Sequence, residues 1–108
     1  MSVPDRIYPG EAIVLTNSFI RPEPDAYDVA GTTAVVTLKA PNGGALIQIA
    51  SEDVTVTFTG TTTVNVAARY TIPRERTSGG IWGYSIVTTD PLNAAYDGTF
   101  KVEFGAAL

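Results

Sequence analysis

The chain has 108 residues, 44% of them hydrophobic, with eleven acidic and seven basic residues and neither histidine nor cysteine. A net charge of −4 repels nucleic acid on average, no apolar run approaches the roughly 18 residues of a membrane span, and no disulfide can form. The length suits one domain with one hydrophobic core. We therefore expect a single domain over residues 1–108 that contacts neither nucleic acid nor membrane.

The first ten residues contain Asp5, Arg6 and two prolines. They lack the apolar stretch of a secretory signal, so we expect the chain to be the mature one. We also expect residues 1–10 to form an arm ahead of the first strand, matched by a C-terminal arm over 105–108. Both arms are expected to leave the domain without disturbing its core.

Seven segments alternate between apolar and polar residues with the period of two that a half-buried strand requires. The last of them is the clearest, because Phe100, Val102 and Phe104 alternate with polar residues. In the first, Asn17 interrupts the apolar face, which favours an edge strand. The seven predicted strands are 12–20, 33–39, 46–50, 53–59, 62–72, 81–88 and 99–104.

The connections between these segments are rich in turn residues. Residues 21–31 hold two prolines and two aspartates, which predicts a long connection that cannot continue a strand. Residues 40–44 include Asn42 and Gly43, a pair suited to a hairpin turn. A loop is predicted from Asp90 to Gly98, and no segment shows a helical pattern.

Seven strands separated by turns every 8–12 residues or so predict an all-β protein, a single immunoglobulin-like antiparallel β-sandwich. A small barrel would give a similar pattern. Trp82 could stack on a ligand, but Tyr84 and Ile86 share its face, which favours a place in the core.

Catalysis has few candidate residues in this chain. Histidine and cysteine are missing, and the serines and threonines have no base at a recognisable spacing. Asp90 and Asp97 could act as a carboxylate pair in glycoside cleavage, but they fall in the predicted loop, where chain reversal explains them better. We expect no enzyme.

Three carboxylates in the long connection, Glu23, Asp25 and Asp28, could hold Ca²⁺ at one end of a sandwich. Their spacing fits no EF-hand loop, and turn formation accounts for them. We therefore expect no metal and no cofactor, and a chelator should leave thermal unfolding unchanged.

Four residues are candidates for partner binding. Arg74 and Arg76 lie in a cationic tract that could pair with carboxylates of a partner, although a solvated loop would read the same way. Tyr27 is an aromatic residue among prolines and aspartates, and tyrosine is enriched at interface hot spots. Leu108, at the end of the C-terminal arm, could fill a pocket on an adjoining subunit.

Several segments together resemble the small immunoglobulin-like proteins of tailed bacteriophages. They are 8–11 (YPGE), the apolar strand that ends at Phe19, 36–43 (VTLKAPNG), 80–84 (GIWGY) and 98–104 (GTFKVEF). The resemblance spans nearly the whole chain. The long connection at 21–31 and the cationic tract at Arg74 are less typical of that group.

The resemblance implies a non-enzymatic virion protein, made in the host bacterial cytoplasm. It would bind other structural subunits, as a capsid cement or decoration protein or as a component of the neck, tail or baseplate, and could form a homo-oligomer on the particle. An immunoglobulin-like adhesion or carbohydrate-binding module of a bacterial surface protein is the alternative. A small hydrolase inhibitor or a chaperone-like partner is a third possibility.

Overall fold

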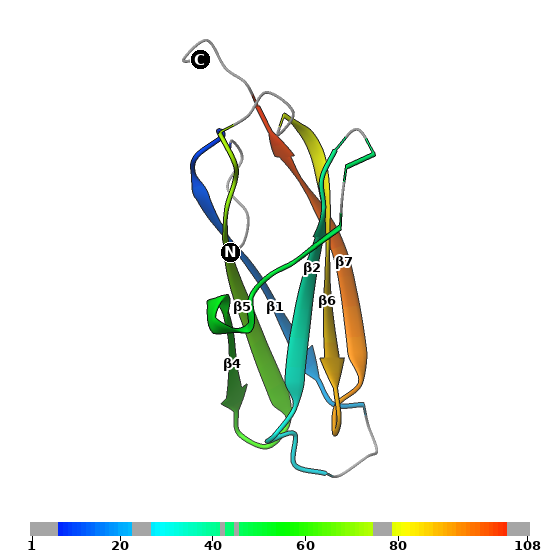
Figure 1. The fold of residues 1–108 in the computed structure, drawn as a ribbon. Helices are drawn as coiled ribbons and strands as arrows, with labels where there is room; N and C mark the ends of the chain where they lie inside the picture. Colours follow the sequence, from blue (N-terminus) through cyan, green and yellow to red (C-terminus); the bar gives the residue numbers. More distant parts are fainter. Residues whose placement is uncertain (1–6, 23–26, 42, 45, 75–78, 104–108) are drawn as a thin grey trace.

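The computed structural model describes residues 7–22, 27–41, 43–44, 46–74 and 79–103. Over these residues it contains seven β-strands in two antiparallel sheets, packed face to face as a sandwich, and no α-helix (Figure 1). No helical segment among them is long and apolar enough to cross a membrane. The strands are β1 (Ala12–Ile20), β2 (Thr33–Lys39), β3 (Leu46–Gln48), β4 (Val54–Thr59), β5 (Thr63–Thr71), β6 (Gly80–Thr89) and β7 (Ala94–Val102), with a short 3₁₀ turn, η1 (Ser51–Asp53), before β4.

The strand order is β1-β5-β4 in one sheet and β3-β2-β6-β7 in the other. Counted in chain order, with β1 in the place of the second strand, these are the D-E-B and C′-C-F-G arrangements of an immunoglobulin sandwich. The predicted all-β sandwich of seven strands is therefore confirmed. The first strand, β1, lies at a sheet edge, as its interrupted apolar face predicted.

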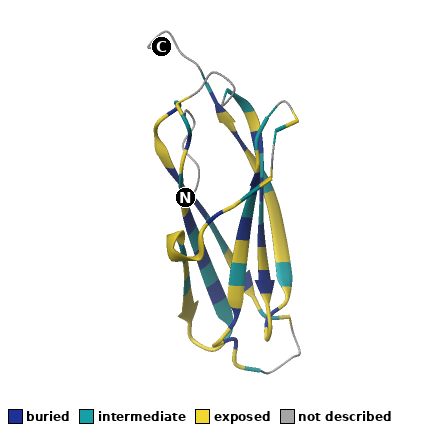
Figure 2. Ribbon diagram, viewed as in Figure 1, coloured by how far each residue is buried: buried dark blue, intermediate teal, exposed yellow. Residues whose placement is uncertain are grey.

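The core lies between the sheets, where the alternating residues of facing strands meet (Figure 2). Trp82 is 1% exposed, and its indole stacks on the ring of Phe100 with the centroids 5.8 Å apart and 13° between the ring planes. Tyr70 of the opposite sheet lies against the same indole, with centroids 6.1 Å apart. The predicted core position of Trp82 is confirmed.

Strands β1 and β2 have the predicted bounds, the ends of β4, β5 and β6 differ from prediction by one residue, and β3 and β7 differ by more. In β4, the alternation places Val54, Val56 and Phe58 on one face, and the register confirms it, because all three lie opposite buried residues of β5; Phe58 is still 39% exposed because β4 is an edge strand. The predicted strand 46–50 ends at Gln48, and Ile49 turns into the core beyond it.

The largest difference is at β7, which begins at Ala94 rather than at residue 99. The predicted loop from Asp90 to Gly98 is wrong, because the chain reverses within four residues. In that turn the N–H of Asp90 donates to Asn93 Oδ1 (3.1 Å), and Asn93 Nδ2 donates to Asp90 Oδ1 (3.0 Å). Asp97 consequently lies within a strand and not in a turn.

The N-terminal arm also needs correction, since part of the segment 1–10 belongs to the core. Ile7 is 1% exposed and forms a parallel bridge with Val102 of β7. Its carbonyl accepts a hydrogen bond from the N–H of Glu103 (2.8 Å). Three residues later the N–H of Gly10 donates to the carbonyl of Ile72 (2.7 Å), so this segment ties the two sheets together.

Candidate interaction surfaces

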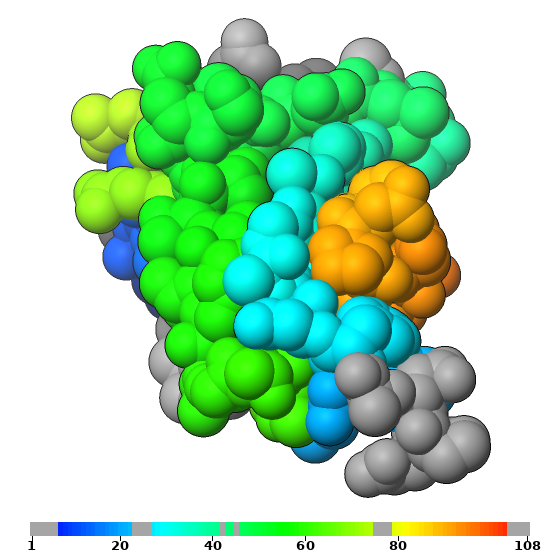
Figure 3. Space-filling view, turned by 90° about the horizontal axis from the view of Figure 1, so that it is seen from below, coloured from blue at the N-terminus to red at the C-terminus, as the bar shows by residue number. Residues whose placement is uncertain are grey.

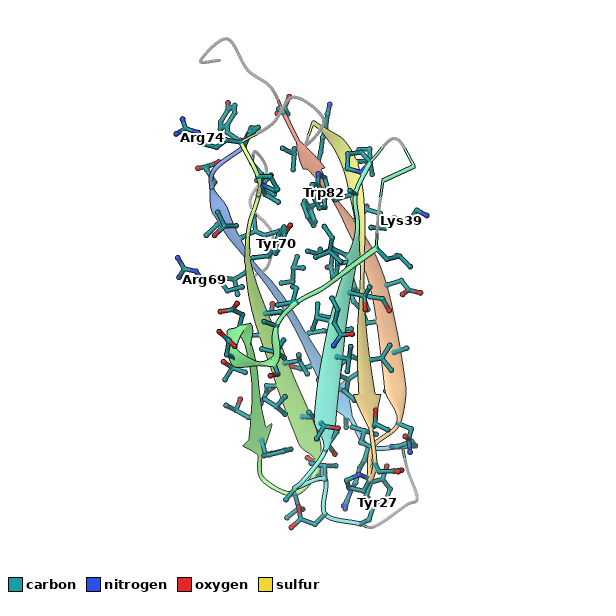
Figure 4. All side chains as sticks on the ribbon, viewed as in Figure 1. Tyr27, Lys39, Arg69, Tyr70, Arg74 and Trp82 are labelled. Carbon is teal, nitrogen blue, oxygen red and sulfur yellow. The ribbon has the colours of Figure 1, made fainter. Side chains whose placement is uncertain are left out.

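One end of the sandwich is formed by the β1–β2 connection, the β4–β5 turn and the β6–β7 turn (Figure 3). Tyr27 lies at this end (Figure 4), where its ring is half-buried and packs against the core. The guanidinium of Arg21 donates a hydrogen bond to the carbonyl of Tyr27. Tyr27 therefore has a structural role that its sequence context did not indicate, and only part of its ring is available to a partner.

The last part of this connection, residues 29–32, is held by a buried threonine. Thr32 is 3% exposed; its hydroxyl donates to the carbonyl of Val29 (2.7 Å) and accepts a hydrogen bond from the N–H of Leu92 (3.3 Å). Val29 and Leu92 are themselves buried. These bonds join the connection to the β6–β7 turn, so the end of the sandwich is a packed surface.

Of the three carboxylates considered for Ca²⁺, only Asp28 lies within the described residues. Its Oδ1 accepts a hydrogen bond from the N–H of Ala30 (2.8 Å), which is the turn role expected of it. Glu23 and Asp25 lie outside the described residues. Within the described part of the chain, no group of three acidic, histidine or cysteine residues is arranged to hold a metal ion.

Arg74 lies at the opposite end of the molecule from Tyr27 (Figure 4). Its side chain is exposed, and its aliphatic stem lies over Gly10 so closely that a Cβ at Gly10 would sit 2.9 Å from Arg74 Cγ. Gly10 also has a φ of 94°, which disfavours any other residue. The stem is thus positioned by packing while the guanidinium faces solvent.

The other two candidates, Arg76 and Leu108, lie outside the described residues. The two candidates that the structure describes, Tyr27 and Arg74, are not brought together into one site. Tyr27 and Arg74, on opposite ends, could contact one partner only if that partner spans the length of the sandwich, or could contact two different partners.

The middle of the outer face of the three-stranded sheet carries small polar side chains, while the apolar Val14 and Ile20 are exposed nearer the two ends of β1. Ser18 Oγ donates to Asn65 Oδ1 (2.7 Å), and Asn65 Nδ2 donates to Thr59 Oγ1 (2.9 Å), so a hydrogen-bonded row crosses all three strands. A shallow hollow of about 360 Å³ lies over this face. Its lining residues are Thr16, Asn17, Ser18, Thr55, Thr57, Asn65, Val66 and Ala67.

The outer face of the four-stranded sheet carries apolar side chains, a feature that the sequence interpretation overlooked. Val35 and Val87 are register partners on β2 and β6, and they are 43% and 42% exposed. Ile81 and Leu46, on the same face, are 58% and 69% exposed. The alternation of β6 contained the signal, because residues 81 and 87 fall on the opposite face from Trp82.

The same sheet has a hollow of about 280 Å³ whose lining includes Leu46, Gly83 and Ser85. Gly83 is flanked in register by Lys39 and Thr99, and Asp97 borders the hollow from β7. A Cβ at Gly83 would find Lys39 Cβ at 4.0 Å as its nearest neighbour, so the hollow exists because this residue has no side chain.

The carboxylates considered for catalysis are not assembled into a pair. Asp97 borders the Gly83 hollow, whereas Asp90 accepts a hydrogen bond within the β6–β7 turn and does not line that hollow. Two titratable side chains that do lie together are Tyr84 and Tyr96, whose ring centroids are 6.1 Å apart. Burial raises the pKa of Tyr84, and Tyr96 raises it further.

No protein-family model matches this chain, and no curated protein matches it.

Proposed function

We propose that this protein is a non-enzymatic structural subunit of a tailed-bacteriophage particle, and that it attaches to neighbouring subunits through the outer face of its four-stranded sheet. It would serve as a capsid cement or decoration protein, or as a component of the neck, tail or baseplate. The observation that carries the proposal is the set of exposed apolar side chains on that face. Exposed apolar groups gathered on one face are a feature of protein–protein contact surfaces.

The geometry of this face suits adhesion to another protein. The backbone beneath it is a hydrogen-bonded sheet, so the side chains are held on a rigid support. The hollow at Gly83 can accept one apolar side chain of a partner, while Lys39 and Asp97 at its border offer both signs of charge for a polar rim. One such contact is weak, but repetition over a symmetric particle increases attachment through effective concentration.

Mass spectrometry of purified phage particles that carry the gene tests the proposal. We expect the chain among the structural proteins of the particle. On the order of hundreds of copies would indicate capsid decoration, and about six or twelve copies would indicate a ring at the neck or baseplate. Absence of the chain from intact particles would contradict the proposal.

A variant pair tests the surface itself. Val87→Lys and Ile81→Lys place a charge on the apolar face, and both positions are exposed, so the fold should tolerate them. We expect each to reduce incorporation into particles. Thr57→Lys, on the exposed outer face of the other sheet, is the matched control and should be incorporated normally. Equal loss with all three variants would show that this face is not the contact.

A further inference from the structure

Among the residues that the structure describes, no strand pairs with the second edge of β1, because β1 lies at the border of its sheet with β5 on one side. Two hydrogen bonds, one at each end of β1, show which of its residues bond to β5. The N–H of Ile72 donates to the carbonyl of Glu11 (2.9 Å), and the N–H of Arg21 donates to the carbonyl of Thr62 (2.9 Å). Antiparallel pairs alternate between bonded and non-bonded residues, so the odd-numbered residues of β1 bond to β5. The N–H and C=O groups that point away from β5 are those of Ala12, Val14, Thr16, Ser18 and Ile20.

Little in the described part of the chain protects this edge. Its nine residues (AIVLTNSFI) include no charge, no proline and no glycine, the usual devices that prevent strand addition. Among the described residues, the hydrogen bond that reaches this row from a side chain is the long one from Asn17 Nδ2 to the carbonyl of Ser18 (3.4 Å).

The other three edges are shorter or better protected. Strand β3 has three residues and β4 has six. Strand β7 carries Asp97 and Lys101 and is bridged near its end by Ile7. That bridge also means that residues 7–10 run toward β7 and not back along β1. The edge of β1 is thus the longest uncharged edge described, at the position where an immunoglobulin sandwich has its first strand.

The exposed apolar residues of β1 match a second copy of the same strand. When two β1 strands run antiparallel about a twofold axis at Thr16, all nine residues overlap and the outward-facing backbone groups meet. Ala12 then lies opposite Ile20 of the second copy, and Val14 lies diagonal to that isoleucine. Val14 is 45% exposed and Ile20 is 72% exposed, so the pairing covers side chains that one copy leaves in water.

The charges at the two ends of β1 also match in this register. Glu11 precedes the strand and Arg21 follows it, so the pairing places Glu11 of each copy opposite Arg21 of the other. Glu11 Oε1 accepts the N–H of Tyr8 (2.6 Å) and Arg21 Nη1 donates to the carbonyl of Tyr27, which leaves the other carboxylate oxygen and further guanidinium N–H groups available. A shift of two residues in either direction loses this correspondence at both ends.

We propose that two copies of this chain associate through antiparallel pairing of their β1 edges, centred at Thr16, to give one continuous six-stranded sheet of two three-stranded halves. The association is isologous, so it closes at a dimer. It uses the edge of one sheet and leaves the apolar outer face of the other sheet free. It therefore holds or fails independently of the proposed role in a phage particle.

Cysteine cross-linking of the isolated full-length protein tests the register, since the chain has no cysteine of its own. With the axis at Thr16, the two copies of a Thr16→Cys variant have Cα atoms about 5.5 Å apart, within the range of about 4.4–6.8 Å that a disulfide needs. A Ser18→Cys variant lies opposite Val14, roughly 13 Å along the strand from its own copy. We expect Thr16→Cys to form a disulfide-linked dimer on mild oxidation and Ser18→Cys to remain uncoupled.

Sedimentation equilibrium of charge-reversal variants tests the proposed contacts between Glu11 and Arg21 at the two ends of the paired strands. The unmodified chain should form a dimer whose fraction increases with protein concentration, over a range that extends to about 1 mM. Glu11→Arg alone and Arg21→Glu alone each put like charges opposite one another twice, and we expect about tenfold weaker dimers. An equimolar mixture of the two variants pairs opposite charges again and should restore the dimer. Thermal unfolding of each variant, at a concentration where it is monomeric, checks that it folds.

Three results would overturn the proposal. The first is a monomer at every concentration, as expected if another segment or protein covers the edge. The second is cross-linking of Thr16→Cys no faster than that of Ser18→Cys. The third is a mixture of the two charge variants that associates no better than either alone.

Discussion

The ring of Tyr84 lies directly over the α-carbon of Gly98, its register partner on β7. A Cβ at Gly98 would lie 2.5 Å from Tyr84 Cζ and 2.6 Å from its hydroxyl oxygen, which no real pair of atoms tolerates. The glycine therefore makes room for an aromatic side chain that crosses from β6 over β7 and closes this part of the core.

The first prediction compares two glycines of this sheet. Gly98→Ala should lower the free energy of unfolding by about 1–3 kcal/mol, because the methyl group must displace the Tyr84 ring. Gly83→Ala, in the neighbouring strand, has its nearest contact at 4.0 Å and should change it by less than about 0.5 kcal/mol. Urea denaturation of both variants measures the difference. Equal effects would mean that the Tyr84 ring moves aside without cost.

Trp82 gives the second prediction, since it lies between Phe100 and Tyr70 in the centre of the aromatic cluster. Trp82→Ala should cost roughly 3–5 kcal/mol, a large part of the stability of a domain of this size. Ile81→Ala, the adjacent residue on the exposed face, should cost less than about 0.5 kcal/mol. The single tryptophan also permits a spectroscopic check: emission at short wavelength that iodide quenches poorly. Long-wavelength, readily quenched emission would contradict the buried position.

The alternation of apolar and polar residues predicted much of this fold, because odd- and even-numbered residues of a strand point to opposite faces of the sheet. It placed β1 and β2 with the observed bounds and put Trp82 in the core. It did not predict the start of β7, since Asp97 and Gly98 disfavour strands locally, while pairing with β6 and the space required by Tyr84 place them in one. Ile7 was missed for a related reason: its burial depends on β7, which is distant in the sequence.

The interaction surfaces were less predictable than the fold. Exposure of Tyr27 depends on whether the end of the sandwich covers it, and a loop sequence does not encode that directly. The apolar outer face could have been found, because Ile81 and Val87 interrupt the polar side of β6. The interrupted apolar face predicted that β1 is an edge strand, but which of its backbone groups point away from its neighbour depends on the pairing with β5, which local patterns do not contain.

The third prediction concerns alkaline pH. Burial raises the pKa of Tyr84 above its usual value of 10.0, Tyr96 raises it further, and burial also raises the pKa of Tyr70. Above pH 10 the unfolded chain releases protons that the folded chain retains, so the free energy of unfolding falls as pH rises. It is unaffected by these groups below that pH. Tyr84→Phe should make the decline shallower, and adding Tyr70→Phe shallower still. Identical declines in thermal unfolding between pH 9 and about 11.5 would contradict this assignment.

The final prediction compares two isoleucines, Ile7 before β1 and Ile20 at the end of β1. Ile7 is 1% exposed and joins the N-terminal segment to β7, whereas Ile20, at the end of β1, is 72% exposed. Ile7→Ala should cost about 2–5 kcal/mol, because it leaves a cavity between the sheets, and Ile20→Ala should change the monomer's stability by less than about 0.5 kcal/mol. A chain that begins at Tyr8 should be destabilised like Ile7→Ala, with further loss because it also lacks the carbonyl that accepts the N–H of Glu103. Denaturation at a protein concentration where the chain is monomeric measures all three. If the chain that begins at Tyr8 were as stable as the full chain, the burial of Ile7 and the hydrogen bond to its carbonyl would contribute nothing to the stability of the domain.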